Sequence, residues 1–251
     1  MTHNFLKLNA DKTEVLVIGF RAQLLKFNLP SIKIAGVRNV AVRSDPIKNL
    51  GGVMFDPEMS MNAQVTNIVK AVNFHLINIS RKRRFLTTEA TKLAIHALVT
   101  SQLDYCRPNG ISNRVLTQLQ NIQRTSARLV TNRRKFDSIT YELIQLHWLP
   151  VKQRIDVKFL SLVYKDLHNQ TPGEITNKLQ VNIRQRRLRS SCSSSLPLVE
   201  PQTRCVSFAD RSFSVYAPKI WNTLSEYIKD SNYEISKSLL NSHLFHEACE
   251  Q

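Results

Sequence analysis

The sequence predicts an α+β fold that is mostly α: a small antiparallel sheet, then a helical bundle, then a small basic C-terminal region. Short β-branched runs are confined to residues 13–56, helical periodicity takes over afterwards, and the composition changes again near residue 170. Continuous apolar runs of about four to eight residues favour strands, whereas apolar steps of three and four favour helices. We therefore expect three parts, at 1–60, 61–170 and 171–251.

The composition is that of a basic globular protein. An apolar fraction of 42% over 251 residues is enough for a substantial core. Lys and Arg number 35 against 19 Asp and Glu, which gives a net charge of +16 and a pI near 10.0. Such an excess attracts polyanions, of which nucleic acid is the commonest. A membrane surface would favour one basic amphipathic helix, but the cations here are spread out. An acidic protein is the alternative partner that this charge allows.

The cysteines and the apolar runs indicate the compartment. No CxxC pair is present, which argues against a zinc ribbon and a secreted disulfide framework. The start of the chain lacks the apolar stretch of a signal peptide, and no apolar run approaches the roughly 18 residues that span a bilayer. We expect a soluble intracellular protein without a membrane partner, in the nucleus or the cytoplasm. The four cysteines are Cys106, Cys192, Cys205 and Cys249.

The sheet is expected from three β-branched stretches. TEVLVIGF (13–20) is typical of a buried strand, and 32–35 with 39–43 predict a hairpin. IKNLGGVMFD (47–56) predicts a further strand. A sheet of three or four strands has one face that another element must cover.

Two helices are expected next. The first carries an apolar face from Val65 to Ile79 and closes with RKRR (81–84), whose cations suit a helix C-terminus. Thr87 or Thr88 is the expected N-cap of the second helix. RPNGIS (107–112) has the composition of a turn.

Two long helical patterns follow within residues 113–168. The first places Arg114, Arg124 and Arg128 opposite its apolar face. The second begins after Pro150 and is apolar around nearly its whole circumference, so we expect it to be deeply buried. Its remaining stripe either faces a negative partner or is a solvated edge. The stripe consists of Arg154, Lys158, Ser161 and Lys165.

The tetrapeptide HWLP separates these two helices. We expect Trp148 to be a buried anchor and His147 to be a packed core residue rather than a catalyst. After residue 170 the sequence is basic and then polar at SSCSSS (190–195). An aromatic-rich, ordered stretch at 204–230 and a last helix at about 234–247 complete the chain.

Catalytic patterns are absent from the sequence. It has no nucleotide-binding glycine motif, no GxSxG and no Asp-Asp pair of the kind that holds two metal ions. The only metal-like spacing is His243, His246 and Cys249, with Cys205 as a fourth candidate, and such a triplet arises easily by chance. We expect no metal and no small-molecule substrate. Composition and spacing favour a binder of polyanions.

Seven stretches occur in an order typical of one family. They are KLNADKTEVLVIG (7–19), NLGGVMFDPEMSM (49–61), SQLDYC (101–106), NIQRTSARLVTNRRKFDSITYELIQLHWLPVKQRIDVKFLSLVYK (121–165), RLRSS (187–191), FADRSFSVYAPKIWNTLSEYI (208–228) and SHLF (242–245). With these stretches the chain resembles the reverse transcriptase of non-LTR (LINE-type, Jockey-like and related) retrotransposons, in the portion C-terminal to the polymerase active site.

The resemblance implies a role for each part. Residues 1–60 would be a palm remnant, 61–170 a helical thumb-like domain that holds the template–primer duplex, and 171–251 a basic C-terminal segment with terminal helices. Lys12 resembles the family's leaving-group lysine. Leu50, Gly51 and Gly52 resemble the primer-grip strand, although this sequence has two glycines where the family usually has one.

The catalytic carboxylates, the fingers and most of the palm have no counterpart here. The resemblance therefore implies a truncated C-terminal fragment of an RNA-directed DNA polymerase that is not an enzyme on its own and has no cofactor, since Mg²⁺ belongs to the intact parent. We expect residual, sequence-independent binding of an RNA or DNA duplex. A relic without function, or a component active only with the missing palm and fingers supplied in trans, are the alternatives. The expected phosphate-binding residues are Arg114, Arg124, Arg128, Arg133, Arg134, Lys135, Arg154, Lys158 and Lys165.

Overall fold

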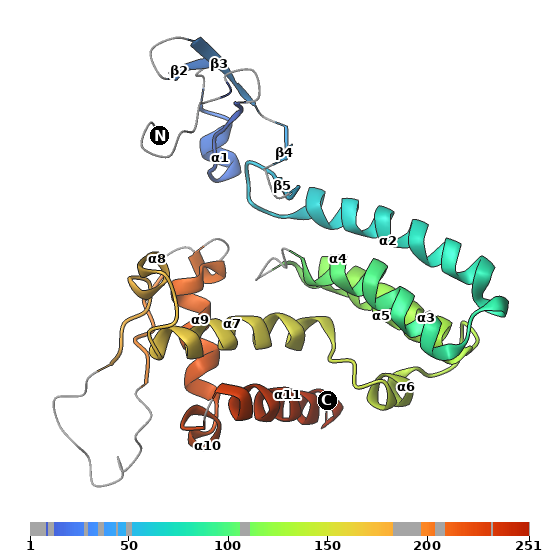
Figure 1. Ribbon diagram of the computed structural model, residues 1–251. Coiled ribbons are helices and arrows are strands. Elements are labelled where there is room, and N and C mark those ends of the chain that lie inside the picture. Colours follow the sequence, from blue (N-terminus) through green and yellow to red (C-terminus); the bar gives the residue numbers. More distant parts are fainter. Residues whose placement is uncertain are drawn as a thin grey trace, which may run out of the picture. The chain divides into compact units, whose positions relative to one another are not determined.

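The computed structural model forms two compact units, Met1–Ala71 and Val72–Gln251 (Figure 1). It is mostly helical, with a small mixed three-stranded sheet near the N-terminus, so the expected mostly helical α+β class is confirmed. No helix in the described part of the chain has the length and apolar character that crossing a membrane requires. The structure describes Asn9 and residues 13–27, 30–34, 38–43, 45–48, 52–105, 111–182, 197–203, 209–231 and 233–250.

The sheet of the first unit has the strand order β1-β3-β2. The expected hairpin is confirmed: β2 (Ser31–Ile34) pairs antiparallel with β3 (Arg38–Arg43). The expectation of a purely antiparallel sheet is wrong, because β1 (Val15–Leu16) pairs parallel to β3. A short helix, α1 (Arg21–Leu24), follows β1, and such a crossover lets the chain return in the same direction.

Two strand predictions need correction. The buried strand expected at 13–20 is only two residues long, and Ile18 within that range is 50% exposed. The single strand expected at 47–56 is instead a pair, β4 (Ile47–Lys48) and β5 (Met54–Phe55), which are antiparallel to each other. Gly52 lies between them with a φ of 77°, a conformation that glycine adopts without steric cost.

The start of helix α2 (Asn62–Lys82) is fixed by the segment before it. The carboxylate of Asp56 accepts hydrogen bonds from the backbone N–H and hydroxyl of Ser60 and from the N–H of Met61. Burial by itself would raise the pKa of Asp56, but these hydrogen bonds outweigh it and lower the pKa below its usual value. The Oε1 atom of Gln64 accepts the N–H of Met54 at 2.8 Å, which holds β5 against the first turns of α2.

The second unit begins within α2, at Val72, and continues with the helix predicted after RKRR. A 3₁₀ turn, η3 (Arg83–Phe85), follows α2. Helix α3 (Thr88–Ile95) begins at Thr87, whose hydroxyl oxygen accepts the N–H of Ala90, so this expected N-cap is confirmed. A π-helical segment, η4 (His96–Thr100), and α4 (Ser101–Asp104) continue it.

The two long helical patterns form α5 (Asn113–Thr131) and α7 (Val151–Leu167), with the short α6 (Thr140–Gln145) between them. Beyond them lie α8 (Gly173–Thr176), η5 (Ala209–Arg211), α9 (Phe213–Thr223), α10 (Glu226–Lys229) and α11 (Tyr233–Glu250). The predicted last helix is therefore confirmed as α11, and most of the aromatic-rich stretch is α9 and α10. The polar stretch 190–195 lies outside the described residues.

Helix α7 is the central element of the second unit, as its apolar circumference predicts. It packs against α5, α9 and α11 (Figure 1). Leu160 and Val163 of α7 are 2% and 0% exposed. The core around them includes residues from the chain beyond 170, so the C-terminal helices and α7 share one hydrophobic core. Its members are Leu160, Val163, Tyr164, Leu198, Ala217, Trp221, Leu224, Ile228, Leu240 and Leu244.

Polar groups on α7 that enter this core are hydrogen-bonded. The hydroxyl of Tyr216 on α9 donates to the carboxylate of Asp156 at 2.5 Å. Burial raises the pKa of Asp156, and burial together with this carboxylate raises the pKa of Tyr216. Tyr164 donates to the carbonyl of Ser231 ahead of α11. These bonds connect α7 to the C-terminal helices at defined positions.

The turn between α6 and α7 carries the HWLP tetrapeptide. His147 has a φ of 53°, and the N–H of Trp148 donates to the carbonyl of Leu143 at 2.9 Å, which is the bond of a Schellman helix end. This geometry turns Trp148 inward, where its side chain is 5% exposed. Its ring packs edge-on against the ring of His96, with 5.4 Å between the two ring centres. The burial expected for Trp148 is confirmed. The prediction that His147 is a core residue is wrong, because the left-handed turn leaves it exposed.

Replacement of Trp148 by Ala should lower the free energy of unfolding by about 3–5 kcal/mol, because it removes a large buried ring from a filled site. Denaturant titration measures this change. Trp148→Phe is the matched control and should cost clearly less, since most of the apolar volume remains. A loss below about 1 kcal/mol for Trp148→Ala would contradict the role of Trp148 as an anchor.

Candidate nucleic-acid interface

A group of cationic side chains on the second unit surrounds one cavity. It lies between the end of α2, the η3 turn and the C-terminal part of α5, and its volume is about 1100 Å³. None of the described residues that line it is an aspartate or a glutamate. We call it the basic cavity. Six cationic residues line it: Arg81, Arg83, Arg84, Arg128, Arg133 and Lys135.

Arg83 has a structural role in this cavity. Its guanidinium donates to the carbonyls of Leu129 at 2.9 Å and Val130 at 3.1 Å, near the C-terminus of α5. A third bond reaches the carbonyl of Leu86 at 2.8 Å. The last carbonyls of a helix lack partners within the helix and carry partial negative charge, so a guanidinium suits them. Arg83 therefore joins the η3 turn to the end of α5.

Two further arginines of the basic cavity have partners within the protein. Arg133 forms an ion pair with Glu142 of α6, with its Nε at 2.8 Å and its Nη2 at 2.7 Å from Oε1. Arg128 is half-buried, and its Nη2 donates to the carbonyl of Asp137 at 3.3 Å. These contacts hold the loop that follows α5. They also occupy part of the hydrogen-bonding capacity of both guanidinium groups.

The side chains of Arg81, Arg84 and Lys135 are exposed around the basic cavity. They come from two chain segments far apart in sequence, the end of α2 with η3 and the loop after α5. Exposed cations of this kind contact phosphate groups, which orients a nucleic acid without reading its sequence. The neighbouring Arg134 is exposed as well.

Residue 132 sets the direction of the loop that carries these cations. Helix α5 is followed by Asn132 as its C-cap, with a φ of 55°. The N–H of Arg133 then donates to the carbonyl of Arg128 at 3.0 Å, a second Schellman-type end. The N–H of Arg134 donates to the carboxylate of Asp137 at 2.9 Å and closes a turn. The loop is thus held by hydrogen bonds at both ends.

The structure brings some of the predicted phosphate-binding residues together and separates others. Arg128, Arg133 and Lys135 line the basic cavity, and Arg134 lies in the same loop. Arg114 and Arg124 are exposed on α5 but do not line the cavity, and Nη1 of Arg124 donates to Asn121 at 3.4 Å.

The predicted stripe of α7 lies elsewhere. Arg154 and Lys158 line a second cavity of about 830 Å³, together with His147, Phe245 and His246. Arg154 pairs with Asp104, whose Oδ1 lies 3.2 Å from its Nε, and its side chain is 20% exposed. Burial lowers the pKa of Arg154. Lys158 is exposed and Lys165 is half-buried. The stripe is therefore neither a fully solvated edge nor a surface whose cations are all accessible to a partner.

The residues carried over from the polymerase resemblance lie mostly outside the described residues. Lys12, Leu50 and Gly51 are among these, while Gly52 lies in the turn between β4 and β5. Sequence reasoning missed Arg81 and Arg84, because RKRR was interpreted only as a helix end. A run of four cations exceeds what one helix C-terminus needs, and that excess is the signal that points to a second role.

Among the described side chains no group of three histidines, cysteines or acids is placed to hold a metal ion. His243 and His246 are exposed on α11, and the side chain of Cys249 and residue Cys205 lie outside the described part. The comparisons with known proteins add no identification: no family model, no curated protein and no solved structure matches this chain.

Neighbouring arginines of RKRR should behave differently on substitution. Arg83→Gln should lower the free energy of unfolding by about 1–3 kcal/mol, because it removes donors from the final carbonyls of α5. Arg84→Gln is the matched control and should change stability by less than about 0.5 kcal/mol, since its side chain is exposed. Urea titration of both variants measures the difference. Equal effects would show that Arg83 does not join η3 to α5.

Proposed function

We propose that this chain binds nucleic-acid duplex, RNA or DNA, without sequence preference, through the phosphate contacts of the basic cavity. The observation that carries the proposal is the convergence of six cations around a cavity whose described lining has no acidic side chain. The positive electrostatic potential of these cations attracts a polyanion, and the net charge of +16 adds to this attraction.

The division of the cations supports a binding surface rather than a purely structural cluster. Arg83 and Arg133 satisfy internal acceptors and keep the surrounding segments in place. Arg81, Arg84 and Lys135 remain exposed on the same cavity. Preformed positions of this kind lower the entropy lost on binding. The resemblance to the thumb-like part of a LINE-type polymerase agrees with duplex binding.

We further propose that the chain is a fragment of an RNA-directed DNA polymerase and has no polymerase activity by itself. Phosphoryl transfer of this kind requires carboxylates that hold two metal ions at the attacking and leaving oxygens. The sequence contains no Asp-Asp pair. The binding of the template–primer duplex is the part of the parent function that the basic cavity can retain.

The salt dependence of binding tests the proposal. The apparent affinity for a duplex should fall steeply with salt, because each phosphate contact releases counterions and adds about −0.9 to the slope of log K against log salt. Substitution of Arg81, Arg84 and Lys135 by Gln should make this slope less steep by about two to three units. Fluorescence anisotropy with a labelled RNA and a labelled DNA duplex measures it.

The control is a triple variant of equal charge change at exposed lysines that do not line the basic cavity: Lys26→Gln, Lys152→Gln and Lys178→Gln. A general field effect would weaken binding equally in both variants. Equal losses, or no binding by the parent protein, would overturn the proposal and favour a relic without function. A third variant with Lys158 and Lys165 replaced reports whether the stripe of α7 contributes.

The purified chain should not extend a primer on an RNA template in the presence of Mg²⁺ or Mn²⁺. The reason is the missing carboxylate pair, without which metal ions are not held at the reacting phosphate. Incorporation of labelled nucleotide measures this activity. Incorporation that persists after removal of contaminating polymerases would contradict the prediction.

A further inference from the structure

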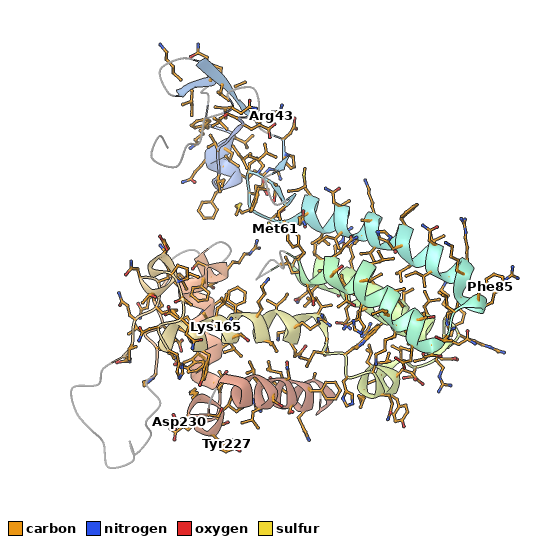
Figure 2. The ribbon with its side chains drawn as sticks, in the orientation of Figure 1. Arg43, Met61, Phe85, Lys165, Tyr227 and Asp230 are labelled. Carbon is orange, nitrogen blue, oxygen red and sulfur yellow. The ribbon has the colours of Figure 1, made fainter. Side chains whose placement is uncertain are left out.

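Two aromatic side chains beside the basic cavity are largely exposed. Phe136 is 91% exposed and Phe85 is 76% exposed. Each directly follows a residue that lines the cavity, Lys135 and Arg84 respectively. Phe85 lies at the turn after α2, as Figure 2 shows. Exposed rings at the edge of a cavity often belong to a binding surface, because their apolar area is otherwise left in water.

Hydrogen bonds fix the two backbone turns that carry these rings. Phe85 ends η3, and Arg83 in the same turn donates to the carbonyls at the end of α5. Phe136 lies within the turn between Arg134 and Asp137, where the N–H of Arg134 donates to the Asp137 carboxylate and the N–H of Asp137 donates to the Arg134 carbonyl. A ring on an ordered turn loses little entropy when a ligand packs against it, since its position is already restricted.

Each ring is accompanied by a cation that also lines the cavity. The guanidinium carbon of Arg84 lies 4.7 Å from the centre of the Phe85 ring, and Nζ of Lys135 lies 5.6 Å from the centre of the Phe136 ring. The same arrangement therefore occurs twice, on two segments that are far apart in sequence. An aromatic face next to a cation is the combination that proteins use to bind unpaired bases together with their phosphates.

The charge of the surroundings favours nucleic acid over a protein partner. An apolar protein groove would place its rings among aliphatic side chains, whereas these rings stand among Arg84, Arg134 and Lys135. A base pair inside a duplex is stacked between its neighbours and offers no face to a side chain. The bases of a single strand are free to stack on these two rings.

We infer that Phe85 and Phe136 are stacking sites for unpaired bases, so that the basic cavity prefers a duplex with a single-stranded extension over a blunt duplex. The inference rests on the proposed function, because the phosphates of the same nucleic acid would contact the cations of the cavity. It adds a ligand feature that phosphate contacts alone do not give, namely a preference for bases that are free to stack.

The test compares three ligands with the wild-type chain at one salt concentration: a blunt duplex, the same duplex with a ten-nucleotide single-stranded extension, and the same extended duplex with abasic sites throughout its extension. The last two carry equal numbers of phosphates and differ only in bases. We expect the extension with bases to bind at least about fivefold more tightly than the abasic one, which is the lower limit for stacking of one base on an aromatic ring.

The double variant Phe85→Ala and Phe136→Ala should abolish that preference and leave the salt slope unchanged, because no phosphate contact is lost. Tyr227→Ala is the matched control, since Tyr227 on α10, labelled in Figure 2, is 73% exposed and does not line the basic cavity. Circular dichroism checks the fold of each variant, and the abasic comparison needs no variant at all.

The outcomes separate the two proposals. Steep salt-dependent binding of all three ligands, with equal affinity for the base-containing and abasic extensions, would overturn the stacking inference and leave duplex binding intact. A loss of preference in Tyr227→Ala as large as in the double variant would also overturn it. Absence of binding to every ligand would overturn the proposed function itself.

Discussion

The enclosure of α7 by α5, α9 and α11 is the constraint on which the second unit depends. A helix covered on three sides can keep a charged or polar group only where a partner meets it, because an unpaired buried group is costly. Arg154 with Asp104, Asp156 with Tyr216, and Asp166 with the hydroxyls of Thr171 and Thr176 satisfy that condition. Each pairing fixes one neighbouring segment, so the polar residues of α7 determine which elements surround it.

The cations of the second unit have two kinds of role. Arg83, Arg133 and Arg154 bind acceptors within the protein, which occupies part of their hydrogen-bonding capacity. Exposed cations such as Arg84 and Lys135 stand where those contacts place them. Truncation of a structural arginine would therefore move the exposed cations, and would weaken the proposed nucleic-acid binding indirectly. The net charge counts both kinds equally, whereas the carboxylates of Glu142 and Asp104 offset the charges of Arg133 and Arg154 locally.

The sequence predicted the helices better than the sheet, for a physical reason. Periodicity reports which face of a helix is buried, and it correctly indicated α2, α5 and α7. The burial of Trp148 was predicted from its place in HWLP between two helices. The pairing of β1 with β3 is a contact between distant residues, which a local pattern does not encode. The same limit applies to the candidate site. Arg128, Arg133 and Lys135 were found from their own segment, but the contribution of Arg81 and Arg84 depends on how η3 packs against α5.

The conformation of His147 illustrates how one backbone angle decides the fate of two side chains. The sequence alone leaves open whether His147 or Trp148 faces the core. The left-handed conformation of His147 places Trp148 there. The chain has two tryptophans, Trp148 beside His96 and Trp221 in the core around α7, and both are buried in the second unit. Intrinsic tryptophan emission is therefore an optical probe of that unit's interior at two separate points. It carries no signal from Met1–Ala71, so a single transition in such a fluorescence experiment describes the helical unit alone.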